Sequence, residues 1–356
     1  MQYRLEDALK YEQPSKYIVQ SEEYSTDISL VPVLTAGKTF ILGYTEENQG
    51  ICKASSAPVI LFDDFTADSR YIDFDFKVKS SAVKILHKMN TEDNLKYFYY
   101  AMQAIKYKPF SHKRVWISEY SKFTVKQRTP NEQNTIVAML DKLENAIKNA
   151  KQRLIELDEL VKSRFIEMFG DVKNNDKNFF VKKGTDLFKF SSGKFLEATK
   201  RLESGIPVYG GNGIAWYTSE PLINFDTIVI GRVGAYCGNV RKISGSNWIT
   251  DNAIYIKEFK EKCFNLEFLE ALMGEYDFAQ FNDAAAQPKI TQKPMENLYY
   301  IVPPIELQNT FAEFVKQVDK SKFVNPLSQE FFMRNFYVFI IYHCITKGCI
   351  NFCMPK

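Results

Sequence analysis

The sequence predicts an α+β protein with two similar globular domains, separated by long coiled-coil helices and related by a pseudo-two-fold repeat. Three observations predict it. A heptad pattern runs through the middle of the chain, and strand-like apolar runs with turn residues between them lie on both sides. Short motifs before this pattern recur after it at a nearly constant separation, which is typical of an internal repeat.

The heptad pattern covers residues 131–169 and alternates steps of four and three between apolar positions. This a/d spacing is typical of a coiled-coil seam, and only Arg164 places a charge in it. At about 1.5 Å per residue the helix would be roughly 55–60 Å long, so it needs a partner helix from this chain or another. The seam residues are Ile136, Leu140, Leu143, Ile147, Ala150, Leu154, Leu157, Val161 and Met168.

The chain before the long helix predicts a β-rich globule. Residues 1–30 have no clear period, and we expect a partly ordered lead-in there. A helix is expected over residues 94–107, loop and strand over 110–125, and Pro130 stands at the start of the long helix, where proline is favoured. The expected strands are residues 31–34, 40–42, 59–62 and 71–76.

The chain after the long helix predicts a second globule. Residues 172–183 read as a linker, and residues 194–203 as a helix. A shorter seam follows from Glu306 and breaks at Lys322 and Pro326. The expected strands are residues 206–209, 227–230 and 248–255, the expected helix is 265–278, and residues 327–356 do not resemble the helix that the repeat requires.

The composition excludes few functions. The net charge of +3 permits nucleic-acid binding but does not indicate it, because basic binders often exceed a pI of about 9. Six cysteines form no CxxC pair and only three histidines accompany them, so neither a zinc site nor a disulfide framework is expected. Without a signal sequence or a long apolar run, we expect no membrane association and a cytoplasmic location.

The repeat gives the chain a family resemblance. Val31-Pro32-Val33 parallels Ile206-Pro207-Val208, and the helix starts Asn94-Leu95 and Asn265-Leu266 correspond. The order of globule, long helix, globule and shorter helix, together with the run 206–214, resembles the specificity subunit of type I restriction–modification systems. The resemblance covers about residues 25–322 and also rests on residues 34–37, 62–66, 228–234, 236–239, 250–253 and 303–308.

The resemblance implies two target-recognition domains that each read half of a split site in double-stranded DNA. Antiparallel helices would hold them apart and dock methyltransferase subunits, which act with restriction subunits. The chain would hold no catalytic centre and no cofactor, and its partners would use S-adenosylmethionine, ATP and Mg²⁺ for adenine methylation and cleavage. The expected parts are recognition domains 1–130 and 172–304, helices 131–171 and a truncated 305–325, and an atypical tail 326–356.

Candidate DNA contacts come from polar and basic residues near turns and strand ends. Arg232 stands between glycines and could read guanine, or could be a solvated or ion-paired charge. Gly210–Gly213 could approach DNA or form a plain turn, and the basic runs of the first domain could contact phosphates or be a solvated face. The candidates are Thr35, Lys38, Lys77, Lys79, Lys84, Lys113, Arg114, Tyr209, Asn212, Arg232, Asn239, Arg241 and Trp248.

The seam residues are the candidate subunit-docking surface, namely Ile136, Leu140, Leu143, Ile147, Leu154, Leu157 and Val161. Because the second helix is short, we expect half of the seam, near Leu154–Met168 or at its other end, to bind another polypeptide or a second copy. The alternative function is a non-catalytic scaffold with two protein-binding heads. Asp63-Asp64 has too few acidic neighbours for a nuclease site, and no metal site is expected.

Overall fold

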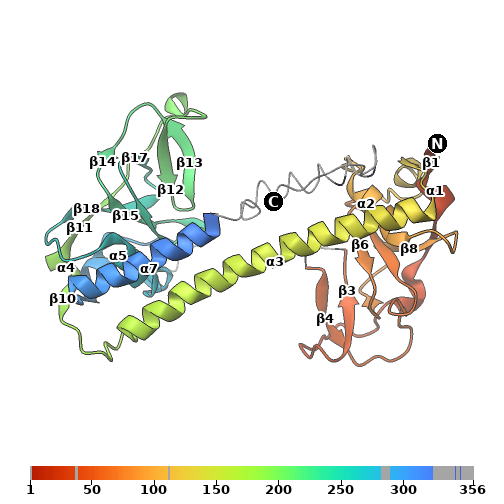
Figure 1. The fold of residues 1–356 in the computed structure, drawn as a ribbon, viewed down its shortest axis with the longest axis horizontal. Coiled ribbons are helices and arrows are strands. Elements are labelled where there is room, and N and C mark those ends of the chain that lie inside the picture. Colours follow the sequence, from red (N-terminus) through yellow and green to blue (C-terminus); the bar gives the residue numbers. More distant parts are fainter. Residues whose placement is uncertain are drawn as a thin grey trace. The chain divides into compact units, whose positions relative to one another are not determined.

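The computed structural model describes residues 2–36, 39–110, 113–281 and 289–323, together with Ile341 and Ile345 (Figure 1). The chain divides into a first unit, residues 1–151 with 327–356, and a second unit, residues 152–326. The two units are treated separately below. Each contains mixed sheets and helices, as the predicted α+β class requires.

The first unit has two main sheets and a short strand pair. Four antiparallel strands have the order β2-β8-β5-β6, and three strands have the order β4-β3-β7. The strands are β1 (Gln2–Arg4), β2 (Leu9–Glu12), β3 (Val31–Leu34), β4 (Ile41–Thr45), β5 (Val59–Asp63), β6 (Ser69–Ile72), β7 (Lys77–Val78), β8 (Val83–Lys88) and β9 (Thr124–Lys126), and the helices before α3 are α1 (Leu5–Ala8) and α2 (Leu95–Gln103), with single turns at Pro14–Tyr17 and Tyr120–Lys122.

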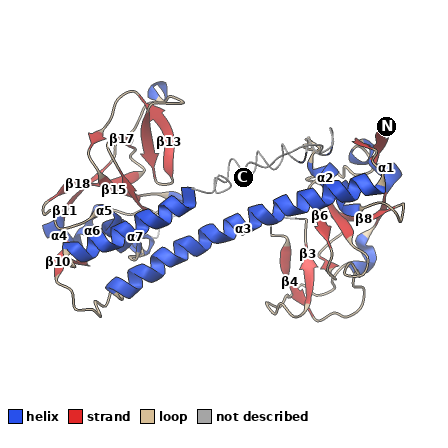
Figure 2. Ribbon diagram, in the orientation of Figure 1, coloured by secondary structure: helices blue, strands red, loops and turns tan. Residues whose placement is uncertain are grey.

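The second unit repeats this plan, with sheet orders β11-β18-β15-β16 and β13-β12-β17-β14 (Figure 2). Its short pair β10-β19 corresponds to β1-β9. The elements are β10 (Val181–Lys183), α4 (Gly184–Leu187), β11 (Phe188–Ser192), β12 (Ile206–Gly210), β13 (Gly213–Thr218), β14 (Ile223–Asn224), β15 (Thr227–Gly231), β16 (Val240–Ile243), β17 (Ser246–Ile249), β18 (Ala253–Phe259), α5 (Leu266–Gly274), α6 (Gln292–Asn297) and β19 (Tyr299–Ile301), with single turns at Ala198–Lys200, Gly234–Tyr236 and Phe278–Phe281.

Helix α3 (Pro130–Phe169) starts with a capping box. The hydroxyl of Thr129 accepts a hydrogen bond from the N–H of Glu132 at 3.3 Å, and the Glu132 carboxylate accepts one from the N–H of Thr129 at 2.9 Å. No glycine or proline interrupts the helix after Pro130, so it continues for 40 residues. Helix α3 thus covers the whole heptad stretch 131–169, and the expected spacer 131–171 extends two residues beyond its end.

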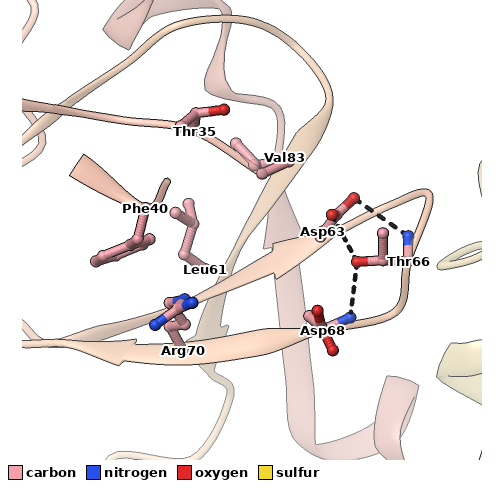
Figure 3. A pocket seen from close by; sticks show the side chains of 9 residues that line it. Thr35, Phe40, Leu61, Asp63, Thr66, Asp68, Arg70 and Val83 are labelled. Carbon is pink, nitrogen blue, oxygen red and sulfur yellow. Dashed lines mark hydrogen bonds between the residues drawn. The ribbon is translucent and has the colours of Figure 1, made fainter. Parts of the chain in front are cut away.

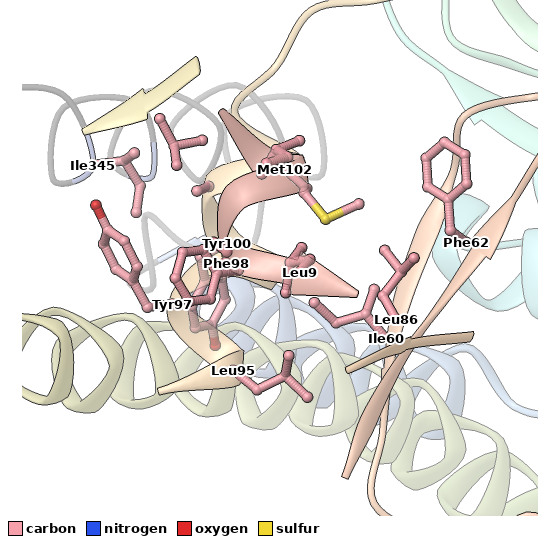
Figure 4. Close-up of a cluster of buried hydrophobic side chains, with 14 of the residues drawn as sticks. Leu9, Ile60, Phe62, Leu86, Leu95, Tyr97, Phe98, Tyr100, Met102 and Ile345 are labelled. Carbon is pink, nitrogen blue, oxygen red and sulfur yellow. The ribbon is translucent and has the colours of Figure 1, made fainter. Parts of the chain in front are cut away.

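The first part of the predicted seam belongs to the core of the first unit. Ile136, Leu140 and Leu143 are buried in one cluster with residues of α2. Figure 4 labels two of these α2 residues, Leu95 and Phe98. The prediction that these three side chains form a subunit-docking surface is therefore wrong. A heptad spacing places apolar residues on one stripe, and that stripe can face a globule as well as a second helix. Ile147 also packs against this core.

The last part of α3 packs on α7 (Ile305–Phe323) in the second unit. The Phe311 ring lies 5.4 Å from that of Phe165 and 5.7 Å from that of Phe169, measured between centroids. The Lys322 ammonium forms an ion pair with Asp158 at 2.8 Å. The predicted pairing of the two helices is confirmed for this end of α3.

Several local expectations are wrong. Residues 2–17 form β1, α1, β2 and a single turn instead of a loose lead-in, because Leu5 and Leu9 are buried in the core. Residues 194–203 contain only one short turn, and residues 248–255 belong to two strands separated at Thr250. The expected linker 172–183 contains the strand β10, and Val172 is buried.

Most of residues 326–356 lie outside the described part of the chain. Ile341 and Ile345 are the two described residues, both helical and both buried in the core of the first unit. They lie four positions apart, which is one helical turn, so the two side chains share a face. That face packs with the buried side chains of the first unit, and Figure 4 labels Ile345 among them.

Candidate nucleic-acid interface

Loops of the first unit meet at one end of its two sheets. The N–H of Lys79 donates to the carbonyl of Leu34 at 2.8 Å, and the N–H of Asp64 donates to Ala82 at 3.0 Å. The N–H of Val115 then donates to the carbonyl of Asp64 at 3.0 Å. We call the described residues 35–36, 39–40, 64–68, 79–82 and 113–115 the first loop cluster.

The second unit builds the same arrangement with the same backbone bonds. Thr250 donates to Tyr209 at 2.9 Å, Arg232 donates to Asn252 at 2.9 Å, and Ile290 donates to Arg232 at 3.0 Å. Residues 211–212, 232–239, 250–252 and 289–290 form the second loop cluster. Loops that a rigid scaffold holds together at one end are a frequent position for binding residues.

This pattern makes Arg232 the structural counterpart of Asp64. The Asp64 side chain is 1% exposed and accepts hydrogen bonds from the N–H groups of Val115 at 3.1 Å and Trp116 at 2.8 Å. It also forms an ion pair with the buried Lys84 ammonium at 3.4 Å. Asp64 is therefore part of the internal structure of the first unit.

Two lysines of the predicted basic run are buried. Lys84 is paired with Asp64 and donates to the Gln13 amide oxygen at 3.0 Å. Lys77 pairs with Glu47 at 2.7 Å and donates to the Gln49 carbonyl at 2.7 Å. Neither ammonium faces solvent, so the prediction that both lie on an exposed basic surface is wrong. Both faces of these strands are covered, since Lys77 and Val78 of β7 and four consecutive residues of β8, 83–86, are all buried.

The other candidates of the first unit lie in or beside the first loop cluster. Thr35 is half-buried, Lys79 is half-buried with its ammonium 5.2 Å from the Tyr24 ring centroid, and Lys113 and Arg114 are exposed. The Arg114 guanidinium donates to the Ser81 hydroxyl at 3.1 Å. Lys38 lies outside the described residues. As candidate DNA contacts all of these remain predictions.

The candidates of the second unit also lie close to its loop cluster. Asn212 and Asn239 are exposed, and the Arg232 guanidinium donates to the Asp251 carbonyl at 3.3 Å. Tyr209, Arg241 and Trp248 are half-buried. The Trp248 indole N–H donates to the Lys194 carbonyl at 2.9 Å, which fixes the ring but occupies its only donor.

A hollow of about 520 Å³ opens beside the first loop cluster (Figure 3). Its floor includes Leu61 and its wall includes Phe40. Two carboxylates and one guanidinium, from Asp63, Asp68 and Arg70, line it. Asp68 and Arg70 were not predicted from the sequence.

Metal and membrane sites are not indicated in the described part of the chain. There, no group of three or more His, Cys, Asp or Glu side chains has a metal-binding arrangement. Among the same residues, no helix combines the length and the apolar character that a bilayer crossing needs.

Comparison with known proteins connects this geometry to one family. The family model described as "Type I restriction modification DNA specificity domain" matches residues 167–329, which include the second loop cluster. The Escherichia coli type I restriction enzyme EcoR124I/EcoR124II specificity subunit is 47% identical over 150 residues. That match spans 39% of this chain and 36% of the relative, about a third of its length.

Solved structures extend the likeness of the fold to nearly the whole chain. The S subunit of a type I restriction–modification system from M. genitalium has a TM-score of 0.63 at 18% identity, covering 96% of this chain and 95% of that one. A chain from a structure on complex assembly and conformational transition of the type I R-M system has a TM-score of 0.51 at 11% identity, covering 97% of this chain and 100% of that one. These solved structures show a shared fold, and the family model and the curated relative show that part of this chain is similar to type I restriction–modification specificity subunits.

Proposed function

We propose that this chain is a sequence-specific DNA-binding subunit of a type I restriction–modification complex, and that each unit reads one half of a bipartite target in double-stranded DNA. The observation that carries the proposal is the duplicated loop cluster, held by the same backbone bonds in both units. Two copies of one reading surface in a single chain suit a target with two separate halves. The family match at residues 167–329 supports a DNA role for the second copy.

Exposed or half-exposed cations near both clusters would supply affinity without sequence information. Lys79, Lys113 and Arg114 are available in the first unit, and Arg232 and Arg241 in the second. Neutralising phosphates releases counterions, so binding should weaken steeply as salt rises. Base-edge contacts would then select the sequence.

Catalysis would belong to partner subunits. We propose that methyltransferase subunits bring S-adenosylmethionine and that restriction subunits bring ATP and Mg²⁺, with this chain directing both to the target. The proposed parts remain recognition domains 1–130 and 172–304, spacer helices 131–171 and 305–325, and the tail 326–356.

Because much of the predicted seam is buried in the protein core, the proposed subunit-docking surface is smaller than the whole seam. Leu154 and Leu157 of the seam are half-buried, and the neighbouring Ile155 and Leu160 are about half exposed, at 52% and 48%. We propose that a partner subunit or a second copy of the chain packs on this stretch of α3. Val161 packs against the core of the second unit and would contribute little to docking.

A binding measurement tests the proposal. The chain, assembled with its methyltransferase subunits, is mixed with randomised duplexes, and the bound fraction is sequenced. We expect enrichment of two short sequences at a fixed separation, and weaker retention for the Arg232→Ala variant. If the complex prefers no sequence and Arg232→Ala and Lys79→Ala retain random duplex as wild type does, the scaffold function replaces the proposal.

A further inference from the structure

The two units place an arginine at the same position of the fold. Arg70 on β6 is opposite Leu61 of β5 in the antiparallel register, and Arg241 on β16 is opposite Val229 of β15. Leu61 and Val229 are themselves equivalent, because each lies three residues before the backbone donor, Asp64 or Arg232, that anchors the loop cluster. Arg70 is therefore the first-unit counterpart of Arg241.

Both guanidinium groups are held against the neighbouring hairpin. The Cζ atom of Arg70 lies 4.4 Å from the ring centroid of Phe40, beside the β3–β4 hairpin. A Cβ atom built on Gly213, at the β12–β13 hairpin, would lie 3.5 Å from Cζ of Arg241. Within the described residues neither arginine forms an ion pair. Stacking on the ring orients the Arg70 guanidinium and leaves its N–H donors available.

The residue two positions before each arginine is also equivalent. The carbonyl of Asp68 accepts from the N–H of Asp63 at 2.8 Å, and the carbonyl of Asn239 accepts from the N–H of Gly231 at 2.8 Å. Asp68 and Asn239 are both exposed. The three residues that end at the equivalent arginine are thus Asp68-Ser69-Arg70 in the first unit and Asn239-Val240-Arg241 in the second.

The Asp68 carboxylate is the open acceptor of the hollow in Figure 3. The other carboxylate, Asp63, already accepts from the N–H of Phe65 at 2.9 Å and from the Thr66 hydroxyl at 2.6 Å. Within the described residues, no donor forms a hydrogen bond with the Asp68 carboxylate, and the Asp68 backbone N–H donates to the Thr66 hydroxyl at 3.3 Å. The hollow is therefore lined by an open acceptor, the Asp68 carboxylate, and by the fork of donors of Arg70.

These side chains match the pattern of base edges in the major groove. Arginine binds O6 and N7 of guanine, aspartate accepts from N4 of cytosine, and asparagine binds N6 and N7 of adenine. Asp68 and Asn239 directly precede β6 and β16, and in an extended chain residues two apart are about 6.6 Å apart, close to two base-pair steps of about 3.4 Å. At each of the two positions, the arginine and the residue two before it can thus reach base pairs about two steps apart.

We propose that Arg70 and Arg241 each read a guanine, one in each half of the target, and that the residue two positions earlier selects a second base. Asp68 selects a cytosine amino group in the first half, and Asn239 selects an adenine in the second. The inference rests on the proposed DNA-reading function and adds the residues that determine its specificity.

Exchanging the two selecting residues tests the inference. The complex with methyltransferase subunits is prepared as wild type, Asp68→Asn, Asn239→Asp, Arg70→Ala and Arg241→Ala, and sequences bound from a randomised duplex pool are compared. We expect Asp68→Asn to change the preferred base at one position of one half only, and Asn239→Asp at one position of the other half only. Each arginine variant should lose about 5- to 150-fold of its preference for one guanine.

Matched controls are Asp73→Asn and Asn224→Asp, exposed side chains outside the loop clusters, which should leave both halves unchanged. Circular dichroism shows whether each variant is folded. An unchanged base preference in the half of the DNA target that the substitution does not affect shows the same. The inference is overturned if folded exchange variants keep the wild-type motif, or if the arginine variants weaken all sequences equally, as phosphate contacts would. If the wild-type complex itself selects no sequence, the proposed function fails with it.

Discussion

The side-chain oxygen of Gln308 accepts a hydrogen bond from the backbone N–H of Asn265 at 2.9 Å. Gln133 makes the same bond to the N–H of Asn94 at 2.8 Å in the first unit. Both glutamines are fully buried, and each also donates to a backbone carbonyl before its own helix, Pro303 or Arg128. This repeated bond joins the start of α7 to the start of α5, and the start of α3 to the start of α2.

We predict that Gln308→Ala destabilises the second unit. The variant would leave the buried N–H of Asn265 and the carbonyl of Pro303 without their partner, at a cost of about 1–3 kcal/mol for each group left unpaired. Urea denaturation measures the loss. Gln317→Ala, an exposed site on the same helix, is the control and should change stability by less than about 0.5 kcal/mol. Equal stabilities of the two variants would show that the bond is dispensable.

The buried Lys84–Asp64 pair gives a prediction that separates stability from DNA binding. Lys84→Ala leaves the Asp64 carboxylate buried without its cation, and removing one partner of such a pair costs about 3–5 kcal/mol. DNA affinity of the fraction that remains folded should match wild type, whereas Lys79→Ala should lower affinity and leave stability unchanged. Chemical denaturation and retention of duplex measure the two quantities. A folded Lys84→Ala protein with normal stability and weakened DNA binding would contradict the internal role of Lys84.

Ile341 gives a prediction about the last part of the chain. Its side chain is 1% exposed in the core of the first unit, and truncating a buried isoleucine typically costs about 2–5 kcal/mol. Ile341→Ala should therefore speed amide hydrogen exchange in α2, as measured by mass spectrometry. Ile155→Ala removes the same atoms from an exposed site and should leave that exchange unchanged. Unchanged exchange in both variants would mean that Ile341 does not stabilise this core.

Glu270 gives a prediction about pH. Burial on α5 raises the pKa of its carboxyl above the usual range, and the N–H of Lys242 donates to it at 2.9 Å. Between the unfolded and the folded pKa the folded state binds more protons, so this group's contribution to stability is present at low pH and declines as pH rises. Glu270→Gln keeps an acceptor for Lys242 and removes the charge. Its Tm should exceed that of wild type at about pH 7, and the gain should shrink toward about pH 4. A gain that is constant with pH would exclude ionisation of Glu270 as its cause.

The long helix could be predicted from the sequence, but its contacts could not. Residues 131–169 lack helix breakers and repeat apolar residues at helical spacing, so the bounds of α3 follow from local physics. The same spacing does not say what covers the stripe. Ile136 and Leu140 pack on α2 of their own unit, which depends on the tertiary fold.

The candidate DNA-contacting residues were predicted only in part, because their exposure and grouping also depend on the tertiary fold. Lys77 and Lys84 look like members of a basic run in the sequence, yet both lie on strands whose two faces are covered, where they pair with Glu47 and Asp64. Arg70 and Asp68 carry no motif of their own. Their equivalence to Arg241 and Asn239 follows from the strand register and from the loop hydrogen bonds. The spacing between sequence motifs alone would align the two units only to within several residues.

The proposed function requires one chain to read two separate DNA sequences for partner enzymes. Mapping methylated bases across the genome of cells that carry this chain and its methyltransferase subunits tests it most directly. We predict methylation at a motif with two short specific segments at a constant separation, and no such methylation in cells that lack this chain. Methylation that is unchanged when the chain is deleted, or a motif with a single uninterrupted segment, would contradict it.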